Sequence, residues 1–261
     1  MTTAEKNYFI ANLSLLYSQL PLSDRFEAAA EHGFSAVEIQ FPYELSISEI
    51  GSKLTEYGLR LHLINIPAGD LLQGGKGLSC HPENEQAFRE ACAQAMEYAT
   101  ALNVRTVNVL AGNLCPEDNR ATCLDTYISN IRYAAELFML EGIQVSFEAI
   151  NDKDMPDYLY HSFTEMLDIY RKTGHANAGM QYDIYHMARM GEDIISQLGE
   201  YGEQIAHIQF ADVPGRGAPG SGSLDLPGIF KAIEASSYIG PVAAEYKITG
   251  DNDLDYAWLK L

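Results

Sequence analysis

The feature that most constrains the fold is a regular alternation of short apolar segments with longer segments of helical character. Short apolar runs bounded by turn residues predict strands, and eight of them occur along the chain. We expect strands at residues 8–12, 36–41, 59–66, 106–110, 143–149, 178–183, 205–210 and 242–246. Because strands that alternate with helices pair in parallel, the pattern favours a parallel α/β sheet.

The segments between the strands carry the residues that start and stop helices. Ser162 and Glu165 have the spacing of a capping box. Gly33, Gly58 and Gly142 each follow the last turn of a helical segment, where glycine is favoured. We expect helices at residues 24–32, 46–57, 85–101, 119–140, 162–172, 193–201 and 226–236.

Length then selects among parallel α/β folds. The chain has 261 residues, and eight strand–helix units in about 250 residues fit a closed (β/α)8 TIM barrel. We predict one barrel domain over residues 1–261, because no linker interrupts the alternation. An open doubly wound sheet is the alternative, but no G-x-G-x-x-G motif follows the first strand, which argues against a dinucleotide-binding version.

The charge of the chain excludes several classes of partner. Asp and Glu number 36 against 17 Lys and Arg, which gives a formal net charge of −19. A surface this acidic repels phosphate backbones and anionic lipids, so we predict no nucleic acid and no membrane as partner. Part of the acidic excess is expected to form a local cation site.

The cysteines and the N-terminal residues bear on the compartment. Cys80, Cys92, Cys115 and Cys123 lack the C-x-x-C spacing of zinc sites and do not suggest a disulfide framework. No basic n-region precedes a long apolar run, and no segment approaches 18 uninterrupted apolar residues. We therefore expect reduced thiols in a cytoplasmic protein, and the sequence leaves a homo-oligomer open.

Several strand candidates end in a side chain that could serve a reaction. Asp183 ends the strand at 178–183, and His186 follows three residues later in an expected loop, as a metal ligand or a substrate contact. Glu148, Gln209 and Glu245 lie near the ends of the fifth, seventh and eighth strand candidates. In a (β/α)8 barrel these ends meet at the face that carries the active site.

Alternation along the strands predicts where these side chains point. Val145 and Phe147 suit the side that faces the helices, which places Glu148 inside the barrel. Three carboxylates and one amide then converge at the rim. Carboxylates this close repel one another and raise their own pKa values, whereas a divalent cation removes that penalty. An oxygen-rich ligand set favours Mg2+ or Mn2+ over zinc, so we predict a metal site at Glu148, Asp183, Gln209 and Glu245.

Other polar residues in the strands have two open interpretations. We expect Glu38 to face the interior in an ion pair rather than to act in catalysis. His207 lies one layer deeper than Gln209, so a hydrogen-bonded structural histidine is favoured. His62 and Asn65 either line a pocket or pack, and we count Asn65 among the candidate substrate contacts.

With these motifs in place, the sequence resembles the hydroxypyruvate isomerases of the xylose-isomerase-like barrel superfamily, nearly from end to end. The most specific matches are Q-Y-D-I-Y-H-M at 181–187, G-A-P-G-S-G at 217–222 and E-Y-K at 245–247. Further matching segments lie at 11–14, 33–34, 37–38, 41–43, 65–70 and 130–135.

The resemblance implies a (β/α)8 barrel that holds a divalent metal through Glu148, Asp183, Gln209 and Glu245. It also implies that Glu148 and Glu245 form the acid–base pair. In the related ketose 3-epimerases the ligand from the seventh strand is usually histidine, so Gln209 places the chain on the hydroxypyruvate isomerase branch.

The activity that the resemblance implies is the interconversion of hydroxypyruvate and tartronate semialdehyde through an enediolate, with no organic cofactor. The small-molecule substrate, a 2-oxo acid or a sugar, would carry polar groups for the protein to bind. Lys247 shares its strand parity with Glu245, and Arg216 lies in a Gly-rich loop, so either is a candidate partner of a substrate carboxylate. His186 is a candidate donor to a substrate oxygen.

Four rival functions remain open at this stage. A 2-oxo-tetronate isomerase and a ketose 3-epimerase would share the fold and the metal site. An endonuclease for damaged DNA would need several metal-binding histidines and a basic groove, which 7 His and a net charge of −19 disfavour. A barrel that binds a metabolite without converting it is the non-enzymatic alternative.

Overall fold

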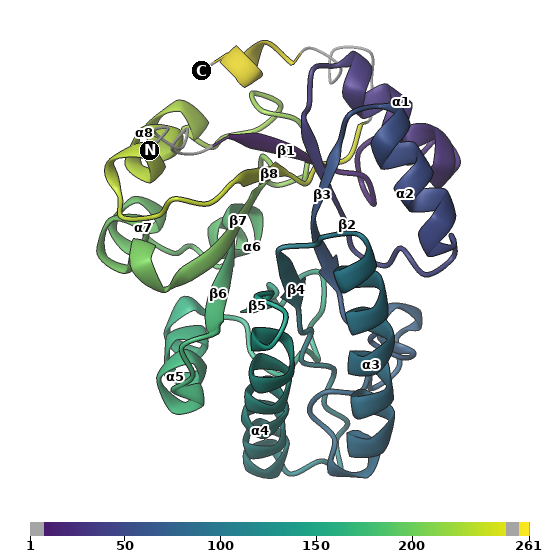
Figure 1. The fold of residues 1–261 in the computed structure, drawn as a ribbon. Helices are drawn as coiled ribbons and strands as arrows, with labels where there is room; N and C mark the ends of the chain where they lie inside the picture. The colour runs from purple at the N-terminus through teal and green to yellow at the C-terminus, as the bar shows by residue number, and fades with distance from the viewer. Residues whose placement is uncertain (1–7, 249–255, 261) are drawn as a thin grey trace.

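A computed structural model of the protein describes residues 8–248 and 256–260. Its eight parallel strands pair in sequence order, and β8 pairs with β1 to close a barrel (Figure 1). The strands are β1 (Phe9–Asn12), β2 (Ala36–Ile39), β3 (Arg60–Asn65), β4 (Thr106–Asn108), β5 (Gln144–Glu148), β6 (Ala178–Asp183), β7 (Ile205–Phe210) and β8 (Val242–Ala244). The predicted (β/α)8 barrel is confirmed, and the open sheet is excluded.

Helices surround the strands on the outside of the barrel (Figure 1). They are α1 (Leu22–Glu31), α2 (Ile47–Glu56), α3 (Glu85–Ala101), α4 (Arg120–Met139), α5 (Phe163–Thr173), α6 (Ile184–Arg189), α7 (Ile194–Tyr201) and α8 (Leu226–Ala235). Short 3-10 turns are η1 (Leu71–Gln73), η2 (Pro82–Asn84), η3 (Gly202–Gln204) and η5 (Ala257–Lys260). The capping box expected at Ser162 and Glu165 does begin α5.

One prediction about local structure is wrong. His186 does not lie in a loop, because α6 begins directly after β6. The reason is the side chain of Asp183, whose Oδ1 accepts hydrogen bonds from the backbone N–H groups of Tyr185 (2.8 Å) and His186 (3.4 Å). An aspartate that satisfies free N–H groups in this way stabilises a helix start. The ordered turn fixes His186 beside Asp183.

Alternation along the strands separates two packed layers. Val145 and Phe147 lie in the layer between the strands and the helices, as predicted. Ser146 and Glu148 point inward, where they bond Gln181 and Asn108 respectively. The polar side chains of β5 therefore line the interior of the barrel.

Apolar side chains close the end of the barrel at which the strands begin. Ile10, Ala36 and Ala243 form a small inner cluster. Outside it, Phe9 and Trp258 meet edge to face with ring centroids 5.1 Å apart. This contact attaches the C-terminal turn η5 to the first strand.

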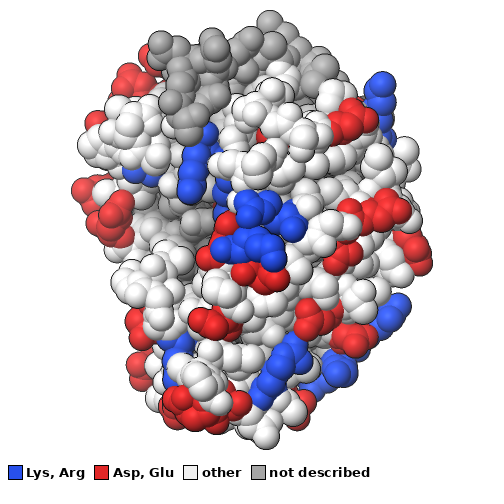
Figure 2. Space-filling model, turned by 180° about the vertical axis from the view of Figure 1, so that it is seen from behind, with Lys and Arg blue, Asp and Glu red and all other residues white. Residues whose placement is uncertain are grey.

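Acidic side chains are spread widely over the surface, in line with the charge of the sequence. Figure 2 shows Asp and Glu over much of one face, with a group of Lys and Arg side chains near its centre. Among residues 8–248 and 256–260, no helix combines the length and apolar character that crossing a membrane requires.

Candidate active site

Three acidic side chains converge where the strands end. Glu148 ends β5, Asp183 ends β6, and Glu245 comes one residue after β8. Ligand atoms of Glu148, Asp183 and His186 all lie within 4.8 Å of one another. Glu245 joins this cluster through Arg216, whose Nη2 donates to Asp183 Oδ2 (3.0 Å) and to Glu245 Oε2 (2.5 Å).

Glu148 is buried and is hydrogen-bonded by the side-chain amides of Asn108 and Gln181. Asn108 Nδ2 donates to Glu148 Oε1 at 2.7 Å. Burial, followed by the nearby charge of Asp183, raises the pKa of Glu148 to about 7. A carboxyl group with a pKa near neutrality can both take and return a proton, which is the requirement for a general acid–base residue.

Glu245 is buried and receives donors on both oxygens. Its Oε1 accepts from Asn12 Nδ2 (3.0 Å) and Gln40 Nε2 (2.6 Å), while its Oε2 faces Arg216. Burial raises the pKa of Glu245 well above its ordinary value, although the guanidinium of Arg216 opposes the shift. Two glutamates with raised pKa values therefore face one small space.

Arg216 is the cation closest to the three carboxylates. It follows the cis peptide between Val213 and Pro214 and has a φ of 55°. Its guanidinium also lies 4.9 Å from the ring centroid of Tyr185. Burial acts against its charge, but Glu245 and Asp183 outweigh burial and raise its pKa above the usual value. Arg216 is thus charged and aimed at the cluster.

His186 is buried and its hydrogen bonds define its tautomer. Asn151 Nδ2 lies 2.6 Å from Nδ1, and the backbone N–H of Asn151 also points to Nδ1 at 3.3 Å. Nδ1 is therefore the acceptor, and the proton sits on Nε2, 3.3 Å from Asp183 Oδ2. Burial lowers the pKa of His186 to about 4, although Asp183 opposes the shift. The imidazole is a neutral donor at neutral pH.

Below the carboxylates, a polar network crosses the barrel. Glu38 is fully buried and accepts from Asn12 Nδ2 (2.7 Å), Gln209 Nε2 (2.7 Å) and His207 Nε2 (2.6 Å). Gln209 Oε1 in turn accepts from Gln181 at 2.8 Å. Glu38 does face the interior, and His207 is hydrogen-bonded as expected of a structural histidine.

A cavity of about 170 Å³ lies over this network. Its polar walls are Gln40, Asn65, Glu148, Asp154, His186, Arg216 and Glu245, and its apolar walls are Leu15, Phe41, Leu72, Leu110, Ile150 and Met155. The space suits a small polar molecule that contacts polar groups on one side and apolar side chains on the other.

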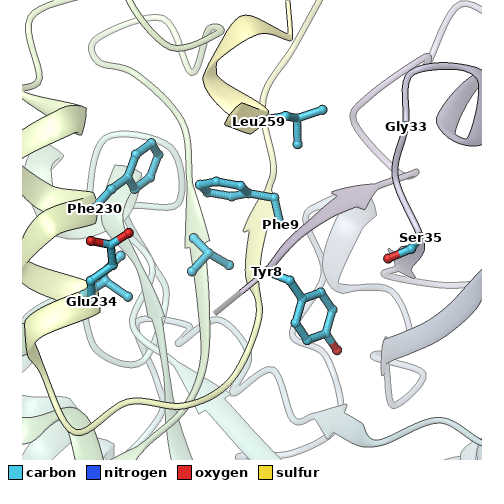
Figure 3. Close-up of a pocket in the computed structure, with 9 residues that line it drawn as sticks. Tyr8, Phe9, Gly33, Ser35, Phe230, Glu234 and Leu259 are labelled. Carbon is cyan, nitrogen blue, oxygen red and sulfur yellow. The ribbon is translucent and has the colours of Figure 1, made fainter. Parts of the chain in front are cut away.

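A larger cavity of about 350 Å³ lies at the opposite end of the barrel, near the starts of β1 and β8. Figure 3 shows Phe9 and Phe230 facing one another there, with Glu234 on the neighbouring turn of α8. Among the described residues of its lining, Glu234 is the only Asp or Glu, so no pair of carboxylates is described in this cavity. The smaller cavity is therefore the candidate active site.

The structure brings most of the predicted site residues together. Glu148, His186, Arg216, Glu245 and Asn65 line the small cavity, with Asp183 behind Arg216 and His186. Gln209 pairs in register with Asp183 but belongs to the network one layer below. Lys247 is exposed and lies outside the cavity lining, and its backbone N–H donates to the carbonyl of Arg216 at 2.8 Å. Its role toward a substrate stays a prediction.

Four residues of the site were missed by the sequence analysis. Asn12 and Asn108 end β1 and β4 and hold the two glutamates, so the rule that found Asp183 could have found them. Gln40 shares the parity of Glu38 one residue beyond β2. Asp154 lies in the loop after β5, and no strand pattern positions it.

The residues present fit a divalent cation. Within residues 8–248 and 256–260, three buried carboxylates meet with Arg216 as the single Lys or Arg in the cavity lining. Their oxygen atoms, together with the amide oxygen of Gln209, are the ligand type that Mg2+ and Mn2+ prefer. Arg216 compensates only part of the negative charge of the three carboxylates, so the site still attracts a cation.

Comparison with known proteins places this site in a family context. The model for the family described as xylose isomerase-like TIM barrel matches residues 26–260. The chain is 37% identical to hydroxypyruvate isomerase of Escherichia coli (strain K12), over 96% of this chain and 97% of that protein. It is 36% identical to 2-oxo-tetronate isomerase of Cupriavidus necator, over 97% of each protein.

Solved structures show the same architecture. A structure titled AP endonuclease, family 2 from Brucella melitensis superposes with a TM-score of 0.92 at 33% identity, over 97% of this chain and 98% of that one. The apo form of 3-keto-D-glucoside 4-epimerase from E. coli gives a TM-score of 0.81 at 19% identity, over 98% of this chain and 99% of the other. The second likeness bears on the fold alone.

Proposed function

The chain belongs to the xylose isomerase-like TIM-barrel family and is an isomerase, and from this premise we propose that it interconverts hydroxypyruvate and tartronate semialdehyde (2-hydroxy-3-oxopropanoate). The observation that carries the proposal is the pair of buried glutamates, Glu148 and Glu245, that line one small cavity. We also propose that residues 1–261 act as one barrel domain.

The reaction moves a carbonyl between adjacent carbons, and the two glutamates are suited to it. One glutamate removes a proton from C3 of hydroxypyruvate, and the electron pair of that C–H bond forms the C2–C3 double bond of an enediolate. Return of a proton to C2, with transfer of the hydroxyl proton from O3 to O2, gives tartronate semialdehyde. The pKa of about 7 for Glu148 supports its part in this exchange.

Charged and polar groups around the pair would hold the substrate. Arg216 is the candidate partner for the substrate carboxylate, because its guanidinium is the one Lys or Arg group in the described lining of the cavity. His186 would donate from Nε2 to a substrate oxygen, and Asn65 offers an amide on the opposite wall. Lys247, exposed at the rim, would attract the anion electrostatically.

A divalent cation completes the proposal. Glu148, Asp183, Gln209 and Glu245 would hold Mg2+ or Mn2+, since they offer oxygen ligands from four neighbouring strands. When bound, the metal supplies Lewis-acid stabilisation of the negative charge on the enediolate. Gln209 would offer its Oε1, which already accepts from Gln181 Nε2 and has a second lone pair, while its Nε2 donates to Glu38.

A 2-oxo-tetronate isomerase is the second candidate. The observation that favours it is the 36% identity to such an isomerase over nearly the whole chain. The two substrates differ by one carbon unit, and both carry a 2-oxo acid group that Arg216 could bind.

A substrate panel separates these functions. Initial rates would be measured for hydroxypyruvate, for a 2-oxo-tetronate and for free ketoses, with Mg2+ or Mn2+ present. We expect kcat/KM to be highest for hydroxypyruvate. A higher value for the 2-oxo-tetronate would favour the second candidate, turnover of ketoses alone would indicate a 3-epimerase, and no turnover at all would reject both proposals.

A further inference from the structure

A third cavity, of about 380 Å³, lies at the end of the barrel opposite to the carboxylates. It extends from the starts of β1, β2 and β3 to the C-terminal ends of α2 and α3. Tyr8, Arg60 and His62 line it from the barrel, and Arg105 lines it from the segment just before β4. Leu54, Leu59 and Leu102 supply an apolar wall.

The charge of this lining differs from that of the chain. Among the described residues of the lining there is no Asp or Glu, whereas Arg60 and Arg105 both belong to it. In a chain of 36 acids and 17 bases, a described lining with two arginines and no acid is a local region of positive potential. Such a region attracts small anions and raises their local concentration.

Neither arginine is neutralised by an ion pair with a described residue. Within residues 8–248 and 256–260, Arg60 and Arg105 have no carboxylate within ion-pair distance, although Arg89, Arg120 and Arg216 each do. Arg60 instead lies over the ring of Tyr8, with 5.5 Å between the guanidinium carbon and the ring centroid. The stacking orients the guanidinium, and its N–H groups make no hydrogen bond to a described residue, so they can donate to a ligand.

His62 lies deeper in the same cavity. Its ring stacks on that of His207, with centroids 5.5 Å apart, and neither nitrogen of His62 hydrogen-bonds to a described residue. Burial, then the charges of His207, Arg105 and Arg60, lowers the pKa of His62 to about 3. The imidazole is therefore neutral and offers one donor and one acceptor to an occupant of the cavity.

We propose that this cavity binds a small organic phosphate. A phosphate group has enough oxygens to accept from both guanidinium groups and from His62 at once, whereas a monocarboxylate has two. The leucine wall suits the carbon portion of such a ligand, and the volume exceeds what the phosphate group alone would fill. This site is separate from the proposed isomerase chemistry, so its occupancy does not depend on the substrate of the enzyme.

Isothermal titration calorimetry at constant ionic strength tests the proposal directly. The probes are glycerol 3-phosphate, inorganic phosphate and acetate, titrated into the full-length protein. We expect saturable binding of glycerol 3-phosphate, weaker binding of inorganic phosphate and none of acetate. Equal affinities for glycerol 3-phosphate and inorganic phosphate would show that the cavity recognises the phosphate group alone, and would reject the proposal of an organic ligand.

Substitutions in the cavity lining and outside it test where the phosphate compound binds. Replacing both arginines (Arg60→Gln with Arg105→Gln) should weaken phosphate binding at least tenfold, while Lys231→Gln on the exposed face of α8 and Arg216→Met in the isomerase site should leave it unchanged. If the double glutamine variant does not fold, Arg60→Lys with Arg105→Lys keeps the charge, removes the planar fork, and should still weaken binding. Absence of phosphate binding to the wild type, unchanged affinity in the arginine variants, or loss of affinity in Arg216→Met would each overturn the proposal.

Discussion

Replacement of Glu38 by Gln tests whether the hydrogen bonds that Glu38 accepts in the buried network stabilise the folded protein. The carboxylate of Glu38 accepts three side-chain donors, from Asn12, Gln209 and His207, and has no exposed surface. A glutamine of the same shape replaces one acceptor oxygen by an NH2 donor. In either orientation of the amide, its NH2 group faces a side chain that already donates a hydrogen bond to this position.

The magnitude follows from the least unfavourable arrangement. The amide oxygen of Gln would accept from Asn12 and Gln209, and its NH2 would face His207. His207 would then have to carry its proton on Nδ1, which is buried and has no hydrogen-bond partner among the residues that the structure describes. Nδ1 lacks a described partner in the wild type as well, so the cost comes from the loss of the charged acceptor: hydrogen bonds to charged groups contribute about 1.5–3 kcal/mol and neutral ones about 0.5–1.5 kcal/mol, a difference of about 1–1.5 kcal/mol for the His207 contact. We therefore expect the free energy of unfolding to fall by about that amount, which lowers Tm by roughly 2–4 °C per kcal/mol in a chain of this size.

Urea unfolding of the chelator-treated protein, followed by circular dichroism, measures the change without stabilisation by a bound metal. Glu49→Gln is the matched control, because Glu49 is exposed in the capping box of α2 and glutamine also serves there. The control should stay within about 0.5 kcal/mol of the wild type. If Glu38→Gln were as stable as Glu49→Gln, the assignment of three donors to Glu38 would be wrong.

Three further predictions concern the site and the end of the barrel. Glu148→Gln should lower kcat by about 10²–10⁴-fold, because the substitution removes the proton-transfer group, while the circular dichroism spectrum stays unchanged. A rate near that of the wild type would exclude Glu148 from the reaction. Treatment with a chelator should abolish isomerisation and Mg2+ or Mn2+ should restore it, whereas full activity in a stringently metal-free sample would refute the metal proposal. Trp258→Ala should lower the free energy of unfolding, measured in urea, by about 3–5 kcal/mol, because the buried ring of Trp258 packs against Phe9 and Phe210. A loss below about 1 kcal/mol would show that the C-terminal turn is not part of the core.

The sequence was sufficient for the order of the elements and for the direction of the strand-end side chains. The bounds of β6, β7 and α3 agree with the prediction because apolar runs and terminating residues are local signals. The inward position of Glu148 followed from the apolar character of Val145 and Phe147 on the other face. Cytoplasmic location and the exclusion of nucleic acid and membrane partners stay predictions.

Contacts between distant residues could not be predicted in the same way. Glu38 and His207 are 169 positions apart, and their 2.6 Å contact depends on the closure of the barrel. The helix after Asp183 was missed because its start is an aspartate that was assigned only to the reaction. Arg216 was expected near the substrate, but its bridge between Asp183 and Glu245 depends on the fold of its loop.

The direct test of the central claim is proton exchange at the substrate carbon. Hydroxypyruvate would be incubated in D2O with the metal-loaded wild type and, separately, with Glu148→Gln, and the C3 proton signal followed by proton NMR. The wild type should wash deuterium into C3 of hydroxypyruvate and place it at C2 of tartronate semialdehyde, while the variant should do so at least about 100-fold more slowly. Equal exchange and equal product formation in the two proteins would contradict an enediolate mechanism that uses Glu148, whereas product without deuterium would show that the base returns the abstracted proton before it exchanges with solvent.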